Sequence, residues 1–196
     1  MIRGILLAAG YGRRLGGAKA LARLESRTFH EIALGAFSEA GITVVSVVNE
    51  RVSASLPAAN PALETRILNP DPDHPSGMFG SIRLGVGAAV DRGADRVLIL
   101  PVDHPRVTAA DIRAVVDGLV TGEVAIPVWE GRRGHPVGLR GAALAEVLGG
   151  AQGLSLRDIV RRDPLRVVEV AGGWGVRAGV NNLQDLEGIG GRPPVK

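Results

Sequence analysis

The sequence predicts an α/β protein with three layers (α/β/α), in which helices cover both faces of one mostly parallel sheet. Short apolar runs alternate with helical patterns over most of the 196 residues, the order expected when helices connect parallel strands. Apolar residues make up 45% of the chain but aromatic residues only 3%, which predicts a core of Val, Leu, Ile and Ala. A chain of this length suits one domain, expected at residues 1–188, followed by a flexible C-terminal tail at residues 189–196.

Each expected element has a local reason. Strands are expected where aliphatic and β-branched runs end at glycine, asparagine or proline, at residues 5–9, 42–48, 65–68, 94–102, 124–128, 130–137 (with its turn) and 165–170. Helices are expected at residues 28–40, 52–59, 77–91, 108–119, 141–148 and 154–162. Thr28 and Glu31 form a capping-box pattern, Gly41 ends that helix, and Thr108 caps another.

Composition excludes several classes of protein. The chain has no cysteine, which excludes disulfides and thiolate chemistry and favours a reducing, cytoplasmic location. No apolar run reaches the roughly 18 residues of a membrane span, and Met1 lies too close to the first strand for a signal peptide, so we expect no membrane partner. The net charge is +3, but the arginines are scattered and stacking aromatics are few, which argues against nucleic acid as a partner. A small anionic substrate is expected instead.

A glycine-rich stretch follows the first apolar run and carries the strongest functional signal. Its backbone N–H groups can surround an anion, and Arg14 and Lys19 add positive charge, so the stretch suits a polyphosphate. It is not a Walker loop, because no Gly-Lys-Ser/Thr is present. It also departs from the dinucleotide fingerprint, because Gly10 and Gly12 match while Leu15 takes the third glycine position.

The pattern Leu7-Ala8-Ala9-Gly10-x-Gly12-x-Arg14-x-Gly16-Gly17-x-Lys19 resembles the signature loop of the MobA-like NTP transferases, nucleotidyltransferases with a Rossmann-like fold. The resemblance implies that Lys19, Arg14 and Asp103 are catalytic. It also implies a nucleotide-binding set made of Leu7, Ala8, Ala9, Gly10, Gly12, Arg14, Lys19, Asn69, Gly77, Met78, Ser81 and Asp103. The chain's only lysines are Lys19 and Lys196, and a compact ammonium suits a tight phosphate pocket better than a broad guanidinium.

A carboxylate at the end of another strand predicts a metal site. Asp103 follows the most strand-like run of the chain, and in an open parallel sheet the carboxyl ends of the strands face the ligand. Mg²⁺ binds one or two carboxylates together with substrate phosphates, and Mn²⁺ can replace it. By resemblance to the family's closing motif, Asn181 takes the second metal-ligand position, where many relatives have aspartate.

The string Gly134-His135-Pro136-Val137 resembles the molybdenum cofactor cytidylyltransferases within this family. The resemblance implies Mg²⁺-dependent transfer of CMP from CTP to a molybdopterin-type phosphorylated acceptor, with His135 and Arg157 on the acceptor side and a molybdoenzyme as possible partner. Ala9 also points to CTP, since the guanylyl-transferring branch usually has glycine there. Gln152 stands where relatives often have aspartate, a departure on the acceptor side.

Two alternative functions remain open from the sequence. One keeps the transfer but uses GTP, or a sugar or alcohol phosphate as acceptor. The other is a non-catalytic protein that holds a pterin or nucleotide and delivers it to a partner enzyme. A nucleotide panel with pyrophosphate detection separates them.

Overall fold

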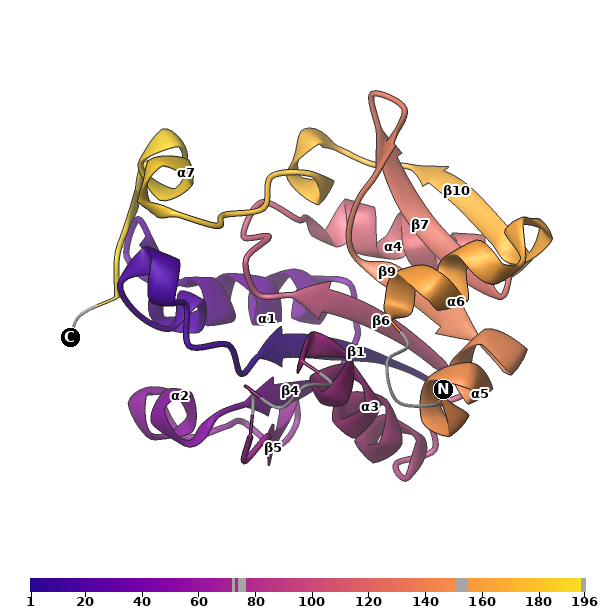
Figure 1. The fold of residues 1–196 in the computed structure, drawn as a ribbon, viewed down its shortest axis with the longest axis horizontal. Coiled ribbons are helices and arrows are strands. Elements are labelled where there is room, and N and C mark those ends of the chain that lie inside the picture. The colour runs from indigo at the N-terminus through magenta and orange to yellow at the C-terminus, as the bar shows by residue number, and fades with distance from the viewer. Residues whose placement is uncertain (72, 74–76, 151–154, 195–196) are drawn as a thin grey trace.

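The computed structural model describes residues 1–71, 73, 77–150 and 155–194. Its main sheet runs in the order β10-β7-β9-β6-β1-β4-β5, with β8 paired to the edge of β7 (Figure 1). The strands of this sheet are β1 (Ile2–Ala8), β4 (Val44–Val48), β5 (Glu64–Leu68), β6 (Arg96–Pro101), β7 (Val124–Trp129), β8 (Arg132–Arg133), β9 (Val137–Arg140) and β10 (Val167–Ala171).

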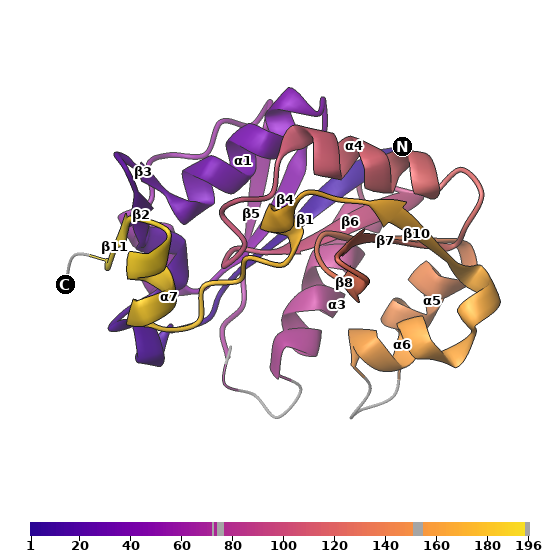
Figure 2. The same ribbon diagram turned by 90° about the horizontal axis from the view of Figure 1, so that it is seen from above.

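Helices cover both faces of this sheet, so the three-layer prediction is confirmed. The helices are α1 (Phe29–Glu39), α2 (Glu50–Ser55), α3 (Gly77–Val90), α4 (Ala109–Gly118), α5 (Gly141–Gly149), α6 (Leu156–Arg162) and α7 (Leu183–Gly188). Figure 2 shows α1 and α4 on one face and α3, α5 and α6 on the other. Each face of the sheet has its own hydrophobic core, and alternate residues of β1 point into one or the other. Leu6 packs in the core that contains Phe29 and Phe37, and Ile5 packs in the core that contains Ile82.

The sheet is mostly parallel. Strand β1 pairs in parallel with β4 and β6, β4 pairs in parallel with β5, and β7 pairs in parallel with β10. Strand β9 is the exception, because it is antiparallel to both β6 and β7. It enters the sheet directly from the β7–β8 turn, so no helical crossover separates it from β7.

Local capping signals place the helices well. Thr28 and Thr108 form complete capping boxes with Glu31 and Asp111, as the sequence pattern indicated for Thr28. The helix expected at residues 52–59 instead spans Glu50–Ser55. Asn49 caps it by accepting a hydrogen bond from the Val52 N–H at 2.8 Å, and the chain is extended before Pro57.

Part of the segment where the sequence predicts a flexible tail, residues 189–196, forms a strand. A small second sheet has the order β11-β2-β3, where β2 is Arg23–Leu24, β3 is Arg27–Thr28 and β11 is Gly191–Arg192. Gly191 pairs with Leu24 and Arg192 with Arg23, and the β-carbon position of Gly17 lies 3.0 Å from Pro194. Backbone pairing therefore attaches β11 to β2, which follows the glycine-rich stretch at residues 10–19 (the glycine loop).

No helix among the described residues is long and apolar enough to pass through a lipid bilayer.

Candidate active site

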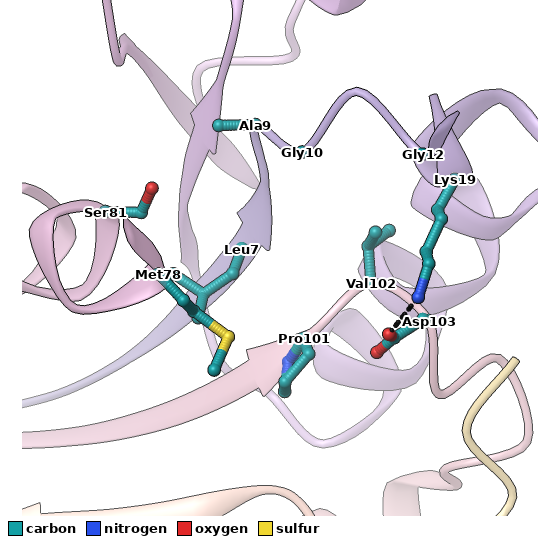
Figure 3. A pocket seen from close by; sticks show the side chains of 10 residues that line it. All are labelled: Leu7, Ala9, Gly10, Gly12, Lys19, Met78, Ser81, Pro101, Val102 and Asp103. Carbon is teal, nitrogen blue, oxygen red and sulfur yellow. Dashed lines mark hydrogen bonds and ion pairs between the residues drawn. The ribbon is translucent and has the colours of Figure 1, made fainter. Parts of the chain in front are cut away.

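The candidate site lies where the carboxyl ends of β1 and β6 meet. These strands are direct neighbours, and the Val102 N–H donates to the Leu7 carbonyl at 3.1 Å just beyond their last pairs. A cavity of about 210 Å³ opens there (Figure 3). It is lined by Leu7, Ala9, Gly10, Gly12, Lys19, Met78, Ser81, Pro101, Val102 and Asp103. The sequence prediction that both strand ends face one crevice is thus confirmed by the geometry.

The glycine loop is folded back on itself at Gly12. This residue has a φ of +61°, and a β-carbon there would lie 2.0 Å from the carbonyl oxygen of Gly17. The Gly12 carbonyl accepts hydrogen bonds from the Leu15 and Gly17 N–H groups at 2.8 and 3.2 Å. Only glycine fits such a closure, which keeps the loop narrow beside the cavity.

Lys19 is the centre of the polar network in this cavity. Its Nζ donates to Asp103 Oδ2 at 2.7 Å and to Asn181 Oδ1 at 3.0 Å. Figure 3 shows the side chain reaching across from the glycine loop to the carboxylate at the end of β6. The side chains of Lys19 and Asp103 are only 22% and 18% exposed. Three segments far apart in the sequence therefore meet at one ammonium group.

The carboxylate of Asp103 is held from both sides. His104 Nδ1 lies 3.0 Å from Oδ1, and Lys19 Nζ donates to Oδ2. The backbone carbonyl of Asp103 separately accepts a hydrogen bond from the Val180 N–H at 2.8 Å. Burial alone would raise the pKa of Asp103, but the hydrogen bond from His104 and the charge of Lys19 outweigh it and lower the pKa to about 2. Asp103 is therefore ionised throughout the physiological range.

The other wall of the cavity comes from the start of α3. Met78 and Ser81 line it, and Figure 3 shows both projecting from this helix. Asn69 supports the wall from behind, because its Nδ2 donates to Ser81 Oγ at 2.9 Å. Asn49, which the sequence analysis did not select, donates from Nδ2 to the Ala9 carbonyl at 2.7 Å while also capping α2. Its position after a strand was the only available signal.

His135 lies next to His104, with ring centroids 4.7 Å apart in an edge-to-face arrangement. Its backbone N–H donates to the Val176 carbonyl at 2.9 Å. Burial, and then the charge of His104, lower the pKa of His135 to about 3. His135 is therefore neutral at physiological pH, and it can offer an acceptor molecule a hydrogen bond but no positive charge.

A cation that the sequence analysis missed lies close to His135. Arg177 adds to the lowering of the pKa of His135, and its Nη1 donates to the Arg133 carbonyl at 2.7 Å. No motif indicated Arg177, because its neighbours in space are remote in sequence.

Within the described residues, several predicted nucleotide-site residues do not line the cavity. Arg14 is exposed on the glycine loop, and Ala8 packs in the core on the opposite face of the sheet. Gly77 begins α3 ahead of Met78. Arg157, which was predicted to lie on the acceptor side, is exposed on α6. Gln152, predicted to mark a departure on the acceptor side, lies outside the described residues.

The donor set near Lys19 fits a divalent cation that arrives with a triphosphate. The Asp103 carboxylate and the Asn181 amide oxygen converge on one point, where the ammonium of Lys19 now lies. Mg²⁺ typically takes one or two protein oxygens of this kind and completes its shell with phosphates and water. No cluster of three His, Cys, Asp or Glu side chains suited to a metal occurs among the residues that the structure describes. The protein alone thus offers a partial coordination shell.

Comparison with known proteins agrees with this geometry. The profile of the MobA-like NTP transferase domain matches residues 4–167. Nicotine blue oxidoreductase of Paenarthrobacter nicotinovorans is 32% identical over 176 residues, 83% of each chain. Rv0371c of Mycobacterium tuberculosis H37Rv has a TM-score of 0.78 at 22% identity over 96% of both chains. A Methanothermobacter nucleotidyl transferase (Mth528) has a TM-score of 0.73 at 24% identity over 96% of this chain and 95% of its own.

The two structural neighbours are only 22% and 24% identical and show the fold alone. The family is shown by the profile match and by the sequence relative. Because the profile covers most of the chain and a relative reaches 32% identity over 83% of it, this chain belongs to the MobA-like NTP transferase family.

Proposed function

We propose that this protein is a divalent-metal-dependent nucleotidyltransferase that transfers CMP from CTP to a phosphorylated acceptor of the molybdopterin type and releases pyrophosphate. The convergence of Lys19, Asp103 and Asn181 beside the glycine loop carries the proposal. Family membership supports the reaction class. CTP and the acceptor rest on Ala9 and on the string around His135 that resembles the cytidylyltransferase branch.

The residues of the cavity have distinct roles in this reaction. The N–H groups of the glycine loop and the ammonium of Lys19 bind the triphosphate, and Lys19 neutralises charge on the departing pyrophosphate. Arg14, exposed on the same loop, adds a cation for the outer phosphates. Asp103 and Asn181 would hold Mg²⁺ or Mn²⁺, which would supply charge neutralisation during the transfer. A structural neighbour, Rv0371c, was solved in complex with manganese.

The acceptor side needs positioning more than acid–base chemistry. A phosphate nucleophile is already ionised at neutral pH, so no general base is required. The neutral ring of His135 offers a hydrogen bond to the acceptor, and Arg177 supplies the positive charge that His135 lacks. Arg157 stays a proposed acceptor residue from the sequence, and a molybdoenzyme that receives the product stays a proposed partner.

A nucleotide panel tests the proposal. CTP, GTP, ATP and UTP are incubated with the protein, Mg²⁺ or Mn²⁺, and either molybdopterin cofactor or no acceptor, and pyrophosphate is measured. We expect release that requires CTP, metal and acceptor together, and that Lys19→Ala and Asp103→Ala abolish while thermal unfolding stays cooperative. Absence of pyrophosphate with every nucleotide in the presence of molybdopterin cofactor would refute the proposed transfer to that acceptor, and preference for GTP would refute the choice of nucleotide.

A second candidate function is an oxidoreductase reaction on nicotine blue or a related compound. It is favoured by one observation, that the relative at 32% identity is named nicotine blue oxidoreductase. The N–H groups of the glycine loop and the charge of Lys19 also suit the pyrophosphate of a nicotinamide dinucleotide, although Leu15 replaces the third glycine of the dinucleotide fingerprint. Loss of the near-ultraviolet absorbance of NADH or NADPH, in the presence of nicotine blue and without pyrophosphate release, would select this candidate.

A further inference from the structure

The proposed reaction assigns no role to His104, although this residue contacts both Asp103 and His135. Its Nδ1 lies 3.0 Å from Asp103 Oδ1, and its ring meets the ring of His135 edge to face at 4.7 Å. The side chain is only 14% exposed. A third neighbour closes the space around the ring, because a β-carbon at Gly179 would lie 3.2 Å from both Cε1 and Nε2 of His104. The imidazole is therefore held on several sides.

A donor held in this way determines the orientation of a carboxylate. The terminal torsion of an aspartate is broad, so its plane is set by the groups that contact its oxygens. In Asp103, Oδ1 faces His104 and Oδ2 faces the point that Lys19 and Asn181 share. Without a partner at Oδ1 the carboxylate can rotate about its terminal torsion. Oδ2 then no longer has a fixed orientation toward the point shared by Lys19 and Asn181. Groups that hydrogen-bond to metal ligands typically change metal affinity by about 10- to 100-fold when they are removed.

We propose that His104 is a positioning residue of the site: its Nδ1–H holds the Asp103 carboxylate so that Oδ2 faces the point shared with Asn181, and it thereby raises the affinity of the protein for a divalent metal. The inference rests on the proposed function for its place in catalysis, but the metal affinity can be measured without any reaction. His104 acts through Asp103 and touches no reacting atom.

Two substitutions at His104 separate the hydrogen bond from the bulk of the ring. His104→Leu keeps much of the volume but removes the donor. His104→Asn keeps an N–H donor near the position of Nδ1. Free Mn²⁺ is measured by electron paramagnetic resonance as protein is added, with the metal alone as probe, and the Mn²⁺ dependence of pyrophosphate release is measured separately.

A matched control removes stability without touching Asp103. Thr108→Ala deletes the N-cap of α4, where Thr108 Oγ1 accepts a hydrogen bond from the Asp111 N–H at 3.2 Å. This variant should lower the melting temperature through loss of the cap. Its Mn²⁺ affinity should remain that of the wild type.

We expect His104→Leu to weaken Mn²⁺ binding about tenfold and His104→Asn to restore most of the loss. In turnover, the Mn²⁺ requirement should rise about tenfold while the KM for CTP changes by no more than about twofold. Wild-type Mn²⁺ affinity in His104→Leu, or an equal loss in Thr108→Ala, would overturn the positioning role. A His104-dependent Mn²⁺ affinity in a protein that releases no pyrophosphate would instead support the positioning role and count against the proposed function alone.

Discussion

Replacing Lys19 by methionine should strengthen the binding of Mn²⁺ to the nucleotide-free protein. The ammonium of Lys19 contacts Asp103 Oδ2 at 2.7 Å and Asn181 Oδ1 at 3.0 Å, the same two oxygens that are proposed to hold the metal. A divalent cation and Lys19 therefore compete for one position. Methionine has a similar length but no charge, so it leaves both oxygens free while filling much of the same space.

The size of the effect follows from the electrostatics of Asp103. Burial raises its pKa, but His104 and Lys19 together lower it from 3.8 to about 2. A pKa change of this size corresponds to about 2 kcal/mol of net stabilisation of the carboxylate. The two partners must also offset the effect of burial, so, if they contribute equally, Lys19 supplies at least about 1 kcal/mol and its removal should raise Mn²⁺ affinity at least about fivefold.

Titration of Mn²⁺ by electron paramagnetic resonance, without and with CTP, tests this competition. In the wild type, CTP should draw Lys19 to its phosphates and so tighten Mn²⁺ binding, whereas in Lys19→Met that coupling should shrink. Arg13→Met is the matched control, because it removes an exposed cation of the same loop that pairs with Asp73 and does not line the cavity. Unchanged or weaker Mn²⁺ binding by nucleotide-free Lys19→Met would refute the reasoning.

Three further changes test other parts of the site. Gly12→Ala should reduce kcat/KM for CTP about a hundredfold, because its β-carbon would lie 2.0 Å from the carbonyl oxygen of Gly17. Gly16→Ala is the control: its β-carbon would have no contact within 4 Å, so it should cost only about 1 kcal/mol of backbone strain. An equal loss of kcat/KM in the two variants would contradict this prediction. His135→Gln should flatten the pH dependence of urea unfolding. Burial, reinforced by a neighbouring histidine, lowers the pKa of His135 to about 3, so the wild type loses stability as pH falls below about 6.5, by about 1.4 kcal/mol at about pH 5.5; parallel curves would count against it. Asn181→Asp should tighten Mn²⁺ binding about tenfold by adding a carboxylate, and unchanged affinity would remove residue 181 from the metal site.

Most of the fold could be predicted because its signals are local. The capping box of Thr28 and Glu31 lies within four residues, and the glycine of the loop that cannot carry a side chain, Gly12, stands in a recognisable spacing. The antiparallel entry of β9 and the pairing of β11 with β2 were not predictable in this way, since both depend on which distant backbone edge is free.

In the candidate site, too, residues with a local sequence signal were predicted and residues that depend on long-range contacts were missed. Lys19 and Asp103 were chosen from motifs at strand ends, and the structure brings them together although they are 84 residues apart. The roles of Asn49 and Arg177 were missed, because a hydrogen bond to a remote carbonyl or a charge beside a buried ring leaves no periodic or motif signal.

Beyond the family resemblance, which indicated most of the residues that line the cavity but not Pro101 or Val102, the sequence by itself determined the three-layer fold and the glycine loop. It could do so because hydrophobic periodicity, capping and positive-φ glycines act over a few residues. Only the tertiary structure decided that Lys19 Nζ donates to both oxygens proposed to bind the metal, that His104 Nδ1 contacts the Asp103 carboxylate, and that the His135 ring is neutral. Those properties arise from burial and from contacts between distant segments, whose electrostatic effect depends on distance in space rather than along the chain.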